Sequence, residues 1–158
     1  MSQTHVTADQ DAVITVIEIA APPARVFEAL TTRSQMMLWG SDAKYKIVEW
    51  EMDARLGGKW SFLVAIAAKP EHKGHYHHGE ILAIDPPRLL EYSWYASFHP
   101  DQNHQTVVRW ELSAIAQGTH LKVTHSGLKT MDGMATGYSQ GWPGLVESLR
   151  NYLEKLAA

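Results

Sequence analysis

Apolar residues follow two different periods along this chain, one typical of β-strands and one typical of α-helices. From residue 44 to about 127, short segments rich in β-branched and aromatic residues alternate with turns rich in Gly, Pro, Asp and Asn. We predict strands at 12–20, 44–52, 57–67, 74–84, 89–98, 105–115 and 119–126. No helical segment separates the last six of these strands, so they are predicted to form an antiparallel meander.

Helical patterns occupy the regions on either side of this meander. The segment APPARVFEALTT begins with two prolines, which suit the first turn of a helix, and continues with apolar residues at helical spacing. A second short helix is predicted at 34–39, with Ser34 as its N-cap and Gly40 as its end. The C-terminal WPGLVESLRNYLEKLAA is amphipathic. Its apolar stripe consists of Leu145, Val146, Leu149, Tyr152, Leu153 and Leu156.

This order of elements indicates an α+β fold. The long C-terminal helix must bury its apolar stripe, and the sheet is the only partner that is large enough. We therefore predict a curved antiparallel sheet of about seven strands that grips this helix, with two short helices after the first strand. A helix covers a curved sheet incompletely, and an apolar space left between the two is a typical site for a small molecule.

Composition and charge narrow the classes of function. The 158 residues suit one domain spanning 1–158, with residues 1–10 frayed, and they can bury a core without metal or disulfide support. The chain has no cysteine, which excludes disulfides, thiolate zinc sites and cysteine nucleophiles. The net charge is −3 and the basic residues do not cluster, so nucleic-acid binding is not expected. The polar N-terminus and the short apolar run at 62–68 predict no secretory signal, no membrane insertion and a cytoplasmic location.

The stretch EHKGHYHHGE holds four histidines within seven positions. In a strand, His75 and His77 share one face, whereas His78 and Glu80 share the other. Apolar residues further along the strand occupy both faces, and a bulge at Gly79 would switch them, so the sequence leaves open which face meets the cavity.

A metal is one interpretation of this stretch. Two histidines on one strand face can share a metal, but a zinc site usually needs a third protein ligand. Glu80 or the distant His125 qualifies only if its side chain shares that face. We expect no metal and no cofactor. A polar strand end near the cavity rim is the favoured interpretation, and a ligand contact by His75 or His77 is the alternative.

Several segments, in order, resemble the SRPBCC superfamily, whose START-like helix-grip fold is shared with Bet v 1. Within it, the chain is similar to the branch named for the C-terminal domain of the activator of Hsp90 ATPase. The similar segments are IEIAAPPARVFEALTT, MLW, DARLGGKWSF, GEILAIDPPRLLEYSW, THLKVTHSGL and GWPGLVESLRNYLEK, and together they cover about residues 12–156. Relatives on this fold bind lipids, polyketides, plant hormones and other hydrophobic molecules, and some catalyse cyclisation, dehydration or hydrolysis. Fold similarity guides function only by association.

Aromatic residues and one histidine are the candidates for the cavity wall, although core packing is the simpler interpretation of most aromatics. Helix ends flank the cavity mouth in the fold that the resemblance implies, which favours Trp39 and Trp142. Tyr92 and Trp94 carry polar groups that can orient a ligand. His125 shares an apolar strand face and can act as a base or a hydrogen-bond donor. The candidate ligand-binding residues are Trp39, His77, Tyr92, Trp94, His125 and Trp142.

Catalytic signals are weaker. There is no G-x-S-x-G elbow, and the neighbours His125 and Ser126 point to opposite faces of a strand, which argues against a nucleophile–base pair. Glu80 is the one carboxylate in a central strand with a plausible inward orientation. The glycine-rich segment 129–141 is either a mobile lid or a plain connection to the long helix.

Three functions follow from these observations. Binding of a small hydrophobic or aromatic molecule in the cavity is the leading hypothesis. An enzyme of the cyclase or hydrolase kind is the first alternative, with His125, His77 or Glu80 as its acid–base group. A chaperone-associated protein-binding module is the second, although no motif specifies a chaperone contact. An exposed sheet edge leaves a homodimer open.

Overall fold

The computed structural model describes the backbone of residues 1–41 and 44–157, and the side chains within these ranges as far as Lys155. The strands are β1 (Gln3–Val6), β2 (Val13–Ile19), β3 (Tyr45–Met52), β4 (Lys59–Ile66), β5 (His75–Asp85), β6 (Leu89–Ala96), β7 (Thr106–Ile115) and β8 (Gly118–Ser126). The helices are α1 (Pro23–Thr31), α2 (Arg33–Trp39) and α3 (Met134–Ala157). All seven predicted strands are present, and each of their ends lies within two residues of its predicted position.

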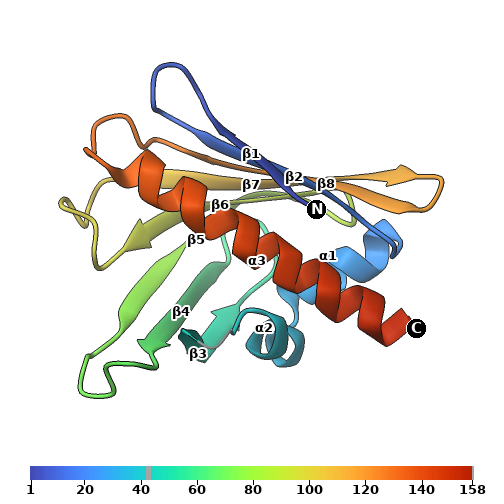
Figure 1. Ribbon diagram of the computed structural model, residues 1–158, viewed down its shortest axis with the longest axis horizontal. Coiled ribbons are helices and arrows are strands. Elements are labelled where there is room, and N and C mark those ends of the chain that lie inside the picture. Colours follow the sequence, from blue (N-terminus) through green and yellow to red (C-terminus); the bar gives the residue numbers. More distant parts are fainter. Residues whose placement is uncertain (42–43, 158) are drawn as a thin grey trace.

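The described strands form one antiparallel sheet in the order β1-β2-β8-β7-β6-β5-β4-β3. Each strand from β3 to β7 pairs with its successor, as expected for a meander, and β2 pairs with β8. Figure 1 shows α3 crossing one face of this sheet, with α1 and α2 beside its C-terminal half. The predicted α+β helix-grip fold is confirmed.

Alternation of buried and more exposed side chains, clearest in β2 and β8, places one face of the sheet in the core. In β8 the buried side chains are Thr119, Leu121, Val123 and His125, while the positions between them are partly exposed. The corresponding face of α3 carries Val146, Leu149 and Leu153, each at most 2% exposed. Leu156, the last residue of the predicted stripe, lies outside the described side chains. No helix in the described part of the chain combines the length and the apolar character that crossing a bilayer requires.

The N-terminus differs from the prediction, because part of the segment expected to be frayed forms a strand. Residues Gln3–Val6 pair with β2 as an eighth, edge strand. The hydroxyls of Thr4 and Thr15 lie 2.9 Å apart across this pair, and the Ser2 hydroxyl donates to Glu147 of α3 at 2.6 Å. A four-residue polar strand carries no hydrophobic alternation, so its pairing was not readable from the sequence.

Two helix starts also differ. α2 begins at Arg33 after Thr32, and no side-chain hydrogen bond caps it, so Ser34 is not its N-cap. α3 begins at Met134 rather than near Trp142, and Pro143 lies inside it. Most of the predicted lid segment 129–141 is therefore the first part of α3.

Candidate functional site

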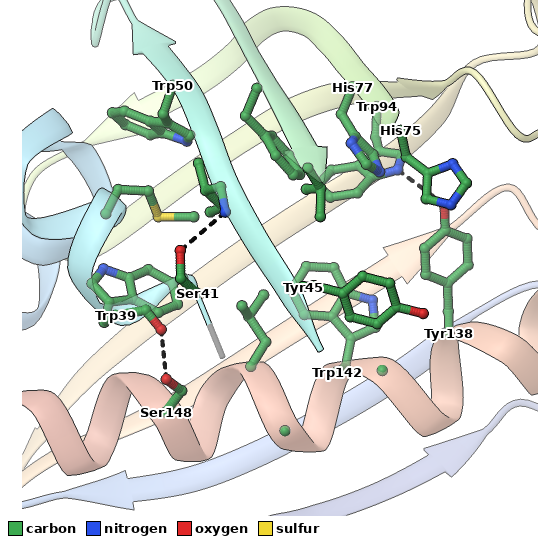
Figure 2. Close-up of a pocket in the computed structure, with 18 of the residues that line it drawn as sticks. Trp39, Ser41, Tyr45, Trp50, His75, His77, Trp94, Tyr138, Trp142 and Ser148 are labelled. Carbon is green, nitrogen blue, oxygen red and sulfur yellow. Dashed lines mark hydrogen bonds between the residues drawn. The ribbon is translucent and has the colours of Figure 1, made fainter. Parts of the chain in front are cut away.

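A cavity of about 720 Å³ lies between the sheet and the helices α2 and α3. Its walls come from β3 to β7 on the sheet and from one side of α2 and α3. Figure 2 shows Trp39, Ser41 and Trp50 on one side of this space and His75, His77 and Tyr138 on the other, with Trp142 rising from α3.

The register of β3, β4 and β5 decides which histidines meet the cavity. One row across these strands consists of Trp50, Phe62 and His77, and the next consists of Ile47, Val64 and His75. All six residues line the cavity. Tyr76 and His78 lie on the outer face and stack on each other. The open question of the strand face is therefore resolved in favour of His75 and His77.

A bulge does occur in β5, but beyond Gly79. The register shifts between Ile81 and Ala83, so the β5 residues before this shift alternate regularly between the two faces of the sheet. Gly79 lacks a side chain for a steric reason, because a Cβ there would collide with the Ser93 carbonyl oxygen and crowd the Trp60 indole nitrogen. That nitrogen donates a hydrogen bond to the same carbonyl at 2.9 Å. Gly79 thus lets the Trp60 indole lie across β5 and form the cavity floor.

Aromatic rings pack around this floor. The Trp60 ring centroid lies 5.6 Å from that of Phe62, 4.8 Å from Tyr92 and 5.3 Å from Trp94. Trp94 in turn lies 5.9 Å from Trp142 of α3. The sheet and the helix therefore meet through aromatic contacts at one end of the cavity, which fixes the shape of its wall.

Three glycines lie on the face of α3 that lines the cavity, together with larger side chains such as Tyr138 and Trp142. Gly137, Gly141 and Gly144 recur at helical spacing and all line the cavity. A Cβ built at any of these three positions has no heavy atom within 4 Å. The space beside this face of the helix is therefore open, and the missing side chains enlarge the cavity.

His77 is a buried titratable group in the cavity wall. Its ring stacks on Phe62 with centroids 4.2 Å apart and planes 4° from parallel. Burial, together with the neighbouring His75 and His99, lowers the pKa of His77 to about 3. Its Nδ1 is buried without a hydrogen-bond partner among the described residues. At neutral pH the ring is uncharged and can present one nitrogen to a ligand.

His125 lies behind the wall rather than on it. It is fully buried, and it is not one of the residues that line the cavity. The Trp142 indole donates to its Nδ1 at 3.2 Å, and the Thr106 hydroxyl lies 2.8 Å from its Nε2. Thr106 donates its own hydrogen to the Trp94 carbonyl at 2.7 Å, so it accepts from a protonated Nε2. Both ring nitrogens are thus occupied, and burial lowers the pKa of His125 well below its usual value.

The other predicted residues lie on the cavity wall. Trp39, Tyr92, Trp94 and Trp142 line it together with His77. The Trp39 indole donates to the Ala29 carbonyl at 2.8 Å, which ties the end of α2 to α1. Burial raises the pKa of the Tyr92 hydroxyl, so this group stays protonated.

Glu80 is not an inward carboxylate. Its side chain is 45% exposed and forms an ion pair with Lys59 at 2.7 Å on the outer face. In the described part of the chain, no group of three or more His, Cys, Asp or Glu side chains is placed to hold a metal ion. Of the three acid–base candidates, His77 is the one that faces the cavity.

Two residues of the cavity wall, Tyr138 and Trp50, were not predicted from the sequence. Tyr138 lines the cavity, accepts a hydrogen bond from the Trp94 indole at 3.1 Å and lies 2.7 Å from Nε2 of His99. Its spacing of four residues from Trp142 continues the apolar stripe of α3 toward the N-terminus, and this was the available signal. Trp50 shares its row with Phe62, but its facing could be assigned only once the β3–β4 register was known.

Comparison with known proteins agrees with this architecture. The sequence profile of the family described as Activator of Hsp90 ATPase homolog 1-like protein matches residues 20–154. The chain belongs to this family. The predicted resemblance is thereby confirmed, although no curated protein matches the chain.

Solved structures show the same fold. A protein from Rhodobacter sphaeroides has a TM-score of 0.80 at 18% identity, covering 99% of each chain. An AHSA1-like protein from Aeromonas hydrophila has a TM-score of 0.75 at 16% identity and covers 92% of this chain and 94% of its own. CalU16 from Micromonospora echinospora has a TM-score of 0.67 at 24% identity and covers 96% and 83%. At these identities the likeness extends to the fold alone.

Proposed function

We propose that this family member binds a small hydrophobic molecule, preferably an aromatic one, in the cavity between the sheet and α3. The cavity itself carries the proposal. Its volume of about 720 Å³ lies within the range of about 300–1,000 Å³ that is usual for small-molecule sites. Aromatic and aliphatic side chains form most of its wall, and they would supply the affinity by removing apolar ligand surface from water.

The glycine face of α3 supports this function. A glycine inside a helix costs roughly 0.5–1 kcal/mol relative to alanine. At Gly137, Gly141 and Gly144 no neighbouring atom would obstruct a Cβ, so close packing does not explain these residues. Their effect is to leave room beside the helix, which a ligand can use.

The direct test is native mass spectrometry of freshly purified protein, compared with its denatured mass. We expect excess mass that corresponds to an organic molecule and that disappears on denaturation. Excess mass of a metal ion that a chelator removes would contradict the proposal.

A cavity-filling variant locates the ligand. Gly141→Leu projects a side chain into the open space beside α3 and should lose the bound molecule. Thr136→Leu is the matched control, because it adds a leucine to an exposed position of the same helix that does not line the cavity. Equal retention of the ligand by both variants would place it elsewhere and overturn the proposal.

A further inference from the structure

One of the six tryptophans differs from the others in the hydrogen bonding of its indole N–H. Five of the six tryptophans donate their indole N–H to another protein group. These internal bonds run from Trp39 to Ala29, from Trp60 to Ser93, from Trp94 to Tyr138, from Trp110 to Tyr92 and from Trp142 to His125. Trp50 is the exception, because its N–H has no acceptor among the described residues.

The Trp50 nitrogen is open to the cavity rather than enclosed in the core. The residue is only 3% exposed, and it lines the cavity from β3. Among the described side chains, the buried and unpartnered nitrogen and oxygen atoms are Nδ1 of His77 and Nδ1 of His99. The Trp50 nitrogen is not one of them, so it reaches the cavity surface as an unused donor. A donor on an apolar wall selects strongly for an acceptor, because leaving it unpaired is costly.

Tyr92 supplies a second unused donor on the same wall. Its oxygen accepts the Trp110 indole N–H at 2.8 Å. An indole nitrogen can only donate, so the hydrogen of the Tyr92 hydroxyl is left for a different acceptor. No described residue accepts it, and Tyr92 lines the cavity. The bond from Trp110 also polarises this hydroxyl and strengthens it as a donor.

The charges on the wall exclude some ligands. No Asp or Glu occurs among the cavity-lining residues within the described ranges, and Lys44 lines the cavity. A cationic ligand would therefore meet no compensating charge there. The rings of Trp50, Trp60, Phe62 and Trp94 line the sheet side of the cavity, where a flat molecule can stack on them.

We infer that the ligand is a flat aromatic molecule that carries no positive charge and has a carbonyl or similar oxygen acceptor, which the Trp50 N–H and the Tyr92 O–H recognise. This inference rests on the proposed binding function and specifies its ligand class. The apolar wall supplies affinity, and the two donors set the orientation of the ligand.

A matched pair of probes tests the inference. Fluorene and 9-fluorenone have nearly the same three-ring shape, but only fluorenone carries an acceptor oxygen. Their dissociation constants are measured by calorimetry for the wild type and for Trp50→Phe, Tyr92→Phe and Met36→Leu. Met36 lines the cavity without a polar group, so its replacement is the control. Thermal melting of each variant confirms that it is folded before binding is measured.

The ratio of the two dissociation constants is the decisive quantity, because differences in hydrophobicity between the probes cancel when variants are compared. We expect the preference for fluorenone to fall about five- to ten-fold in Trp50→Phe, as for the loss of one neutral hydrogen bond. The preference should also fall in Tyr92→Phe and stay unchanged in Met36→Leu. A ratio that is the same in all four proteins, with both probes bound, overturns this inference and leaves the binding function intact. Failure of both probes to bind the wild type overturns both.

Nuclear magnetic resonance gives an independent readout. In a ¹⁵N-labelled sample the Trp50 indole signal is identified by its absence in Trp50→Phe. We expect fluorenone to shift this signal downfield and fluorene to leave it near its free position. Equal shifts with the two probes would contradict a hydrogen bond to the carbonyl.

Discussion

At the scale of single residues, five of the six predicted ligand-binding residues line the cavity, and His125 lies behind its wall. Trp39 and Trp142 were predicted from their positions at helix ends, and Trp94 from its polar N–H group. His125 was predicted because it shares an apolar strand face, which is expected to meet the helix. The pattern could not show that Trp142 lies between His125 and the cavity and occupies its Nδ1. Sequence gives the face of a strand, but not which side chain covers that face.

The His125 network leads to a stability prediction rather than a catalytic one. His125→Ala removes a fully buried ring and leaves the Trp142 indole without its acceptor. The expected loss in the free energy of unfolding is about 2–4 kcal/mol, from the cavity created and the unpaired donor. Chemical denaturation measures it. A variant that unfolds like the wild type yet loses activity toward a substrate would support the catalytic role that the closed network argues against.

At the scale of elements, α3 is where local sequence signals and tertiary structure disagree most. Glycines at 133, 137, 141 and 144 and the proline at 143 are typical of a loop. The structure nevertheless continues the helix back to Met134. Packing of Ala135, Tyr138 and Trp142 against the sheet side outweighs the low helix propensity of these residues. The strands were easier to predict, because the alternation of apolar residues and the turn residues between strands indicate the same boundaries.

The glycine face therefore predicts a trade-off between stability and binding. Gly137→Ala and Gly141→Ala should each stabilise the fold by roughly 0.5–1 kcal/mol, because alanine is the better helix former and each Cβ enters open space. The double variant should bind the 9-fluorenone probe more weakly, because two methyl groups narrow the cavity. Denaturant midpoints and calorimetry on the same samples measure the two effects. Stabilisation with unchanged binding would show that the ligand does not approach this face of α3.

At the scale of the whole molecule, the fold buries several histidines in their neutral form, so acid is expected to destabilise it. Burial lowers the pKa of His77 and of His125, and it also lowers the pKa of His99. In the unfolded chain each of these groups returns to its ordinary value of 6.5. Below that pH the unfolded state binds more protons than the folded state, so the free energy of unfolding decreases as the pH falls. This coupling exists because the histidines lie between the sheet and α3, an arrangement that no single segment specifies.

The contribution of His77 to this pH dependence can be isolated. Its pKa is about 3 in the folded protein, so its stabilising effect is complete above pH 6.5 and is lost progressively between 6.5 and 3. At pH 5 the loss from His77 alone is about 2 kcal/mol. His77→Phe removes the titrating group and keeps an aromatic ring against Phe62. Urea unfolding at pH 7.5 and pH 5 should therefore show a decrease in stability that is about 2 kcal/mol smaller in the variant than in the wild type. If the two proteins lose the same stability over this interval, His77 is protonated in the folded state near its ordinary pKa, and its ring is more accessible to water than its position beneath Trp94 and Phe62 indicates.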